Sequence, residues 1–78
     1  MFFKRKRVQQ EVSIAGMKCE HCAANAKEFL ESIKDVKSVK VSLKDKKAII
    51  ESKNGIDEEL IYKAISDAGY LALGITTL

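Results

Sequence analysis

The sequence predicts a small α+β domain in which two helices cover one face of a four-stranded antiparallel sheet. Four short segments alternate apolar and polar residues, which is the period of a half-buried strand, and two longer segments repeat apolar residues at helical spacing. Their order is strand, helix, strand, strand, helix, strand. The 78 residues leave room for one core, and a composition of 46% hydrophobic and 32% charged residues is typical of a folded globular chain.

The first strand and the first helix are predicted within the first half of the chain. Apolar and polar residues alternate over residues 8–15, and Gly16 ends this strand. After a short loop, a helix is expected over about residues 20–34. Asp35 suits its end, because Asp tolerates the left-handed conformation. The predicted apolar stripe of this helix consists of Cys22, Ala26, Phe29, Leu30 and Ile33.

The second and third strands are expected to form a hairpin. Apolar positions alternate with polar ones over residues 39–43 and again over residues 48–51. The polar stretch between them suits a turn around Asp45. Asn54 and Gly55 form a strong turn signal, so the third strand is expected to end before them.

A second helix and a fourth strand complete the predicted order. Asp57 is a suitable N-cap, and the two acidic residues after it favour a helix N-terminus. Gly69 lies where a C-terminal cap belongs, and residues 70–75 suit a last strand. The predicted buried stripe of this helix consists of Leu60, Ile61, Ala64, Ile65 and Ala68. The order of the elements predicts the ferredoxin-like βαββαβ fold.

The positive charge is concentrated before the predicted domain. The chain has 14 Lys and Arg residues, 11 Asp and Glu residues and a net charge of +3, and the four basic residues at 4–7 account for this excess. We expect residues 1–7 to form a flexible basic arm and residues 8–78 to form one domain. Contact of the arm with an anionic membrane is the alternative to plain disorder. The nearly neutral domain argues against nucleic acid as a partner.

The sequence predicts a cytoplasmic location. The basic start is not followed by an apolar segment, so no secretory signal is recognised. No apolar run approaches the roughly 18 residues that span a bilayer. In the reducing cytosol, thiols remain free.

Cys19 and Cys22 form a CxxC motif at the boundary between the first loop and the first helix. Two cysteines and one histidine exclude a scaffold of several disulfides and a zinc finger with four Cys, or two Cys and two His, ligands. The spacing lets both sulfurs converge, and the free N–H groups at a helix N-terminus stabilise thiolate. Two soft sulfur ligands suit Cu(I), whereas Zn(II) takes four ligands.

The chain resembles the heavy-metal-associated domain family over about residues 8–75. The residues that carry the resemblance are Gly16-Met17-Lys18-Cys19-Glu20-His21-Cys22 and Ala68-Gly69-Tyr70. The family includes copper chaperones, N-terminal domains of copper- or zinc-transporting P-type ATPases, and mercury-binding proteins. The resemblance implies that Cys19 and Cys22 are metal ligands. It points to a free-standing bacterial copper chaperone, with an excised ATPase domain as the alternative.

Four neighbours of the cysteines are candidates for supporting roles. Lys18 stands where zinc- and cadmium-type relatives commonly carry Asp, which favours Cu(I) over Zn, Cd or Hg. Met17 is expected to pack under the loop, with thioether ligation as the alternative. His21 is expected to point outward, with metal tuning or ligation as alternatives. Tyr70 is expected to shield the metal or hydrogen-bond near a thiolate.

The predicted function is a non-enzymatic Cu(I) carrier that passes its ion by thiolate exchange. The expected acceptors are the metal-binding domain of a copper-transporting P-type ATPase and a copper-responsive repressor, and two chains could share copper in a homodimer. Lys18, Lys27 and Lys63 could form a basic docking face. Leu71 and Leu73 make the last strand unusually apolar, which favours self-association or contact with the arm.

Two other functional classes fit the sequence poorly. A thioredoxin-type redox enzyme also carries CxxC at a helix N-terminus, but that fold places a cis-proline opposite the motif and this chain has no proline. RNA-recognition modules share the βαββαβ order and stack bases on aromatic side chains of the central strands. None of the corresponding positions here is aromatic, which argues against RNA binding of this kind; they are Glu11, Ser13, Ile49 and Glu51.

Overall fold

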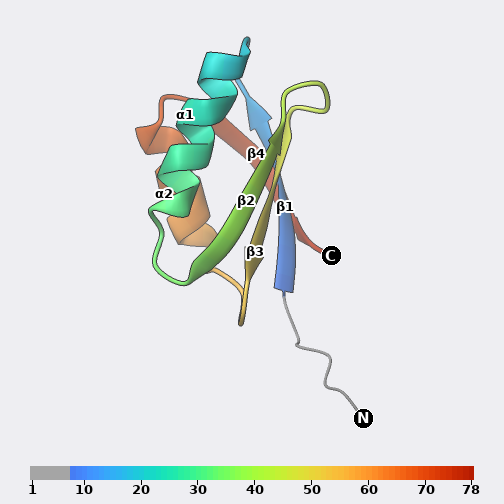
Figure 1. Cartoon of the computed structure of the whole chain (residues 1–78), viewed down its shortest axis with the longest axis vertical. Helices are drawn as coiled ribbons and strands as arrows, with labels where there is room; N and C mark the ends of the chain where they lie inside the picture. Colours follow the sequence, from blue (N-terminus) through green and yellow to red (C-terminus); the bar gives the residue numbers. More distant parts are fainter. Residues whose placement is uncertain (1–7) are drawn as a thin grey trace.

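The computed structural model describes residues 8–78 and confirms the predicted ferredoxin-like fold (Figure 1). Residues 1–7, where the basic arm is predicted, lie outside the described part. The four strands form one antiparallel sheet in the order β2-β3-β1-β4, and both helices lie against the same face of it (Figure 1). The elements are β1 (Val8–Ala15), α1 (Glu20–Glu31), β2 (Val36–Ser42), β3 (Lys47–Ser52), α2 (Glu58–Asp67) and β4 (Leu71–Thr77).

The hydrophobic core lies between the helices and the sheet. Alternate residues of β1 and β3 point into it, as the period-two pattern predicts. Leu60 was predicted to be buried, which is wrong, since its side chain is 47% exposed. The short α2 meets the core through a narrow stripe that starts at Ile61, and a residue one position earlier points about 100° away from that stripe. The fully or nearly buried core residues from the two helices are Ala26, Leu30, Ile61, Ala64 and Ile65.

Capping decides where the helices begin and end. The Asp57 carboxylate accepts from the backbone N–H of Glu59 at 3.1 Å, so the predicted N-cap of α2 is confirmed. α1 ends at Glu31, three residues before the predicted position. The hydroxyl of Ser32 donates to the carbonyl of Phe29 at 2.7 Å and thereby satisfies an end carbonyl. Asp35 does adopt a left-handed conformation (φ 76°), but it does so in the turn after the helix.

Two strand boundaries also differ from the prediction. β2 begins at Val36, three residues earlier than expected, because its backbone already pairs with Ser52 of β3. β4 begins at Leu71. Tyr70, predicted as the first strand residue, therefore belongs to the turn between α2 and β4.

A buried glutamine ties the loop before α2 to the sheet. Gln10 points into the core from β1 and is 5% exposed. Its amide nitrogen donates to the carbonyl oxygen of Ile56 at 3.0 Å, and its amide oxygen accepts from the Ile56 N–H at 2.8 Å. The side chain thus pairs both backbone groups of a buried loop residue that has no strand partner.

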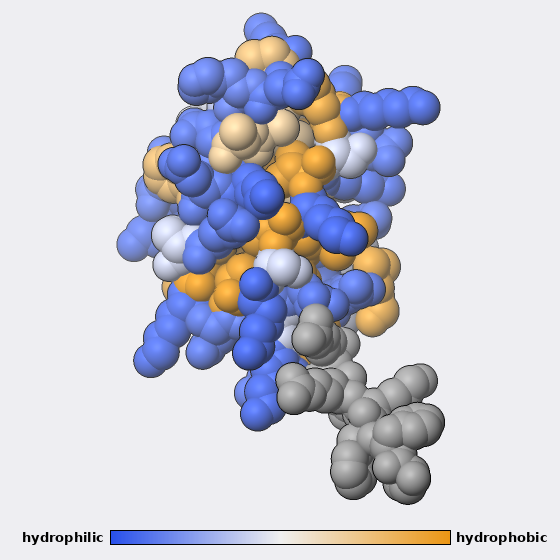
Figure 2. All heavy atoms as spheres, in the orientation of Figure 1, coloured by the Kyte–Doolittle hydropathy of each residue, from blue (hydrophilic) through white to orange (hydrophobic). Residues whose placement is uncertain are grey.

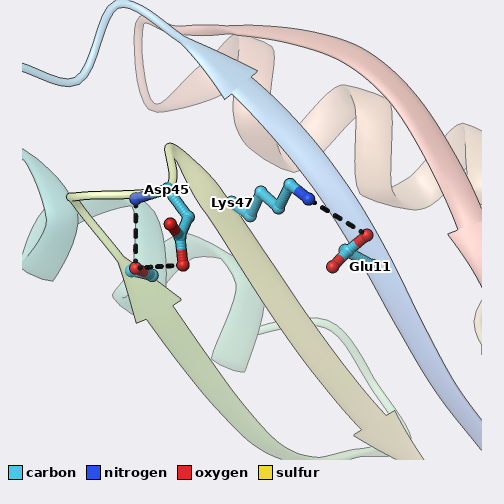
Figure 3. Close-up of polar contacts among 4 residues, drawn as sticks. Glu11, Asp45 and Lys47 are labelled. Atoms are coloured by element: carbon cyan, nitrogen blue, oxygen red, sulfur yellow. Dashed lines mark hydrogen bonds and ion pairs between the residues drawn. The ribbon is translucent and has the colours of Figure 1, made fainter.

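The sheet face opposite the helices is polar at its centre. Lys47 of β3 and Glu11 of β1 form an ion pair across adjacent strands, with Nζ and Oε1 3.6 Å apart (Figure 3). In the β2–β3 hairpin, the backbone N–H of Asp45 donates to the hydroxyl of Ser42 at 3.2 Å (Figure 3). Ser13 and Ile49 complete the centre of this face. The centre of this face therefore carries charged, small and aliphatic side chains.

Several apolar side chains lie on the surface. Leu71 and Leu73 of the edge strand β4 are 62% and 63% exposed. Figure 2 shows a band of apolar atoms bordered by hydrophilic side chains on the face that it presents. Within residues 8–78, neither helix is long and apolar enough to cross a membrane. A groove between α1 and β2 is lined by Ala23, Ala24, Lys27, Val39, Lys40 and Val41.

Candidate metal centre

The two cysteines lie at the N-terminus of α1, as the sequence predicts. Cys19 is the N-cap residue with an extended backbone (φ −154°, ψ 172°), and its carbonyl accepts the helical hydrogen bond of Ala23 at 3.1 Å. Cys22 is the third residue of the helix. The two Sγ atoms are 3.6 Å apart and both thiols are free. Cys19 is exposed and Cys22 is half-buried, so an incoming group meets Cys19 more readily.

Hydrogen bonds stabilise the thiolate form of Cys22. A hydrogen bond from the Tyr70 hydroxyl is the main reason that the pKa of Cys22 falls from its usual 9.0 to about 6. The backbone N–H of Lys18, the thiol of Cys19 and the backbone N–H of Cys19 contribute in the same direction, while partial burial opposes them. The sulfur of Cys22, the third residue of the helix, accepts a hydrogen bond from the backbone N–H of the N-cap residue Cys19. This is the arrangement of a capping box, with sulfur in place of the usual carboxylate. At neutral pH, one of the two sulfurs is therefore ionised before any metal arrives.

The turn between α2 and β4 places Tyr70 against the cysteine loop. Gly69 has a left-handed backbone (φ 94°), and the N–H of Tyr70 donates to the carbonyl of Ile65 at 3.0 Å, which closes the end of α2. Gly16 has a positive φ of 103°, which favours glycine, and a Cβ there would lie 3.3 Å from Cδ1 of Tyr70, so the ring would have to move by a few tenths of an ångström. The hydrogen bond that Tyr70 donates to Cys22 also raises the pKa of Tyr70.

The other predicted neighbours of the cysteines take different positions. Met17 is 5% exposed and belongs to the core under the loop. Lys18 has an exposed side chain, and its backbone N–H donates a hydrogen bond to the sulfur of Cys22. His21 is exposed on the first turn of α1. In residues 8–78, no three His, Cys, Asp or Glu side chains gather at one point that could hold a metal ion.

Asn25 is a site neighbour that the sequence reasoning missed. It lies one helical turn after Cys22, and its side-chain amide nitrogen is 3.5 Å from the carbonyl oxygen of Ala68. Its side-chain amide also acts to lower the pKa of Tyr70, against the larger effect of Cys22 that raises it. The available signal was the residue type, because Asn competes with the backbone for hydrogen bonds and is disfavoured inside a helix.

Comparison with known proteins identifies the family. Residues 11–70 match the family model described as the heavy-metal-associated domain. The chain belongs to the heavy-metal-associated domain family. Copper chaperone CopZ of Enterococcus hirae is 39% identical over 66 residues, a match that covers 83% of this chain and 96% of that protein. The solved structure "CopZ metallochaperone" superposes with a TM-score of 0.78 at 26% identity and covers 83% of this chain and 98% of that one.

Two longer proteins contain a segment similar to this heavy-metal-associated domain. Mercuric reductase of Shewanella putrefaciens is 36% identical over 61 residues, which are 78% of this chain and 11% of the reductase. Copper-transporting ATPase 1 of Rhizobium meliloti is 31% identical over 68 residues, which are 87% of this chain and 8% of the ATPase. The chain thus matches only a small part of each of these two proteins.

The lowered pKa of Cys22 predicts how its reactivity depends on pH. In the reduced, metal-free domain, the rate of Cys22 alkylation is expected to rise about tenfold per pH unit at acid pH and to level off above about pH 7, because the thiolate is the reactive form. Mass spectrometry of the labelled peptide measures this rate. Tyr70→Phe is expected to move the midpoint upward. A midpoint near 9 in the unaltered domain would contradict the hydrogen-bonded thiolate.

Proposed function

We propose that this domain binds one Cu(I) ion through Cys19 and Cys22 and passes it to an acceptor protein by thiolate exchange. The observation that carries the proposal is the pair of thiol sulfurs 3.6 Å apart at a helix N-terminus, where one of them is stabilised as thiolate. Soft thiolate ligands suit Cu(I) and Zn(II), and a site with only two of them favours Cu(I), because structural Zn(II) sites take four ligands. On this proposal the domain is a carrier, not an enzyme.

The relatives and the residue before the motif support copper as the cargo. A protein named as a copper chaperone aligns with this chain over 96% of the chaperone's length and 83% of this chain. A copper-transporting ATPase contains a similar segment. Lys18 places a positive charge next to Cys19, which repels a divalent ion more than a monovalent one. The similarity to mercuric reductase makes Hg(II), another soft ion, the second candidate cargo.

The exchange follows from the difference in exposure between the two cysteines. A thiolate of the acceptor adds to the bound ion while both Cys19 and Cys22 remain attached. The exposed Cys19 then dissociates, a second acceptor thiolate takes its place, and Cys22 leaves last. No electron changes hands, because each incoming thiolate replaces a departing one, and Cys22 leaves as the thiolate that its hydrogen bonds stabilise. The ion is never free in solution.

The proposed acceptor is the metal-binding domain of a copper-transporting P-type ATPase in the cytoplasm. A copper-responsive repressor and a second copy of this chain that shares the ion are further proposed partners. Lys18, Lys27 and Lys63 are exposed, and Lys27 lies 4.0 Å from the carboxylate of Glu31. On this proposal, an acidic acceptor surface is attracted to the exposed Lys18 next to Cys19, mainly through faster association.

Transfer between two purified proteins tests the proposal. The Cu(I)-loaded domain is mixed with a P-type ATPase metal-binding domain that carries its own CxxC, in the presence of a colorimetric Cu(I) chelator. We expect Cu(I) to reach the acceptor faster than it reaches the chelator, because exchange needs no free ion. An acceptor with both cysteines replaced by Ser is the control. Capture of the ion by the chelator before any reaches the acceptor would overturn the proposal.

A further inference from the structure

Three leucines lie exposed along one edge of the sheet. Leu71, Leu73 and Leu78 are 62%, 63% and 62% exposed, more than any other large apolar side chain of residues 8–78. Residues opposite each other on paired strands share a face. Leu71 is opposite Ala15 of β1, and Leu73 borders the same surface pocket as Ala15. Leu78 donates its N–H to the carbonyl of Gln9, an exposed residue, so all three leucines lie on the face opposite the helices.

β4 is an edge strand without the usual protection against pairing. The sheet order leaves β2 and β4 at the two edges. An edge strand presents backbone N–H and C=O groups to any strand that can pair with it, and lysines commonly prevent this. β2 carries Lys37 and Lys40, whereas residues 71–78 contain no charged residue. Two copies of β4 therefore meet without charge repulsion, and the strand has no acidic group to attract the basic residues at 4–7.

The hydrogen bonds to β1 determine which backbone groups of β4 face the open edge. The N–H of Leu78 points toward β1, since it donates to the carbonyl of Gln9 at 2.7 Å. Backbone groups of successive residues in an antiparallel strand point to alternate sides. The irregularity in the β1–β4 pairing lies on the N-terminal side of Gly74, so the alternation holds from there on. The backbone groups of Ile75 and Thr77 therefore point away from β1.

We propose that two copies of this chain form a dimer by antiparallel pairing of their β4 strands, with the two-fold axis at Thr76. In this register Ile75 of each copy pairs with the partner's Thr77, so both residues whose backbone groups face the open edge are used. The two sheets then join into one sheet of eight strands. The contact is isologous, because each copy contributes the same strand and every contact occurs twice.

The same register brings the exposed leucines together. Leu78 lies opposite the partner's Gly74, within reach of the partner's Leu71 and Leu73. A Cβ on Gly74 would meet nothing within 4 Å, so this place on the face has room for a leucine side chain. One strand pair and six leucines form a small interface, below about 1,200 Å², which is typical of weak and reversible complexes. We therefore expect a dissociation constant of about 0.1 mM.

The dimer leaves both pairs of cysteines accessible. The cysteine loop follows Ala15, which pairs with Leu71 at the end of β4 that is distant from Thr76. In an antiparallel pair these ends point in opposite directions, so the two CxxC motifs lie at opposite ends of the joined sheet. This inference goes beyond the proposed function and does not depend on it. The contact needs neither copper nor the cysteines, unlike a pair of copies that share one ion.

Sedimentation equilibrium of the reduced full chain with a metal chelator tests the proposal. From about 10 μM to about 1 mM, we expect the average mass to rise from 8.7 kDa toward twice that value. Thr77→Pro removes an N–H that faces the open edge, so the pairing with β1 persists and the dissociation constant rises at least about tenfold. Leu60→Ala, a change at an exposed leucine of α2, is the matched control and is expected to leave dimerisation unchanged.

A pair of opposite charges tests the register. Leu73→Lys and Leu78→Glu are each expected to raise the dissociation constant at least about tenfold, because each places an unpaired charge among leucines. In an equimolar mixture of the two variants, the new ammonium of one chain lies beside the new carboxylate of the other. The mixture is therefore expected to regain dimers. Failure of the mixture to do so would contradict pairing centred on Thr76.

Three further results would overturn the proposal. They are a chain that stays monomeric up to about 1 mM, including the case in which residues 1–7 cover the leucines, dimerisation that Leu73→Lys leaves at full strength, and dimerisation that is lost when Cys19 and Cys22 are both replaced by Ser. If circular dichroism shows that Thr77→Pro does not fold, Leu73→Lys and the mixture decide. Failed transfer of copper to an acceptor would leave every one of these readouts intact, since no copper is present.

Discussion

Cys22→Ser is expected to weaken Cu(I) binding more than 100-fold while the fold persists. Loss of an outer partner of a metal ligand typically costs about 10- to 100-fold in affinity, and loss of a ligand costs more. Serine has nearly the size of cysteine but offers a hard, neutral oxygen that suits Cu(I) poorly. Competition with a Cu(I) chelator measures the affinity, and circular dichroism checks the fold. Cys19→Ser is expected to behave in the same way.

His21→Ala is the matched control for the cysteine variants. His21 lies between the two cysteines in sequence, is exposed, and belongs to the same helical turn as Cys22. Its removal is expected to leave Cu(I) affinity within about threefold of the original value, a change of about 0.7 kcal/mol or less. Tight binding of one Cu(I) by either serine variant, or a loss in His21→Ala as large as in the serine variants, would contradict the assignment of the site.

Gln10→Ala is expected to lower the free energy of unfolding by about 3 kcal/mol. The change leaves the N–H and the carbonyl of Ile56 without the partners that lie at 2.8 and 3.0 Å, and each buried polar group left unpaired costs about 1–3 kcal/mol. Total stabilities of small domains are about 5–15 kcal/mol, so the effect is large. Urea unfolding at equilibrium measures it.

Gln9→Ala is the matched control for Gln10→Ala. Gln9 is the preceding residue of β1, and its side chain is exposed, with one contact to Glu51 at 3.5 Å. Surface changes of this kind are usually within about 0.5 kcal/mol. A loss below about 1 kcal/mol in Gln10→Ala, or equal losses in both variants, would show that the buried pairing with Ile56 does not stabilise the loop.

The local patterns in the sequence were sufficient to predict the elements and their order. Alternation and helical spacing depend on neighbours along the chain, so they locate β1 and both helices well. The errors arise where tertiary contacts decide. Leu60 fits the helical stripe of α2, but the core touches only the part that begins at Ile61. Likewise, α1 stops early because Ser32 caps it, and a serine there carries no unique signal in sequence.

The candidate site was predicted in part. The position of Cys19 and Cys22 at a helix N-terminus follows from local pattern, since the loop glycine and the helical spacing lie beside the motif. The main hydrogen-bond partner of Cys22, Tyr70, is distant in sequence and arrives through the turn after α2, so only the family resemblance placed it near the thiolates. Asn25 and Gln10 carry no such motif and were missed. Each is a polar residue whose partner lies more than 40 positions away.

The most direct measurement is a competitive titration of the reduced domain with Cu(I) and Zn(II), with the stoichiometry determined by native mass spectrometry. A site of two thiolates predicts one Cu(I) per chain, retained in excess Zn(II), because soft sulfur ligands favour Cu(I) and Zn(II) takes four ligands. The same titration with Hg(II) and Cd(II) ranks the remaining soft ions. Displacement of Cu(I) by Zn(II), or an unchanged Cu(I) stoichiometry when Cys19 and Cys22 are both serine, would contradict the proposed site and cargo.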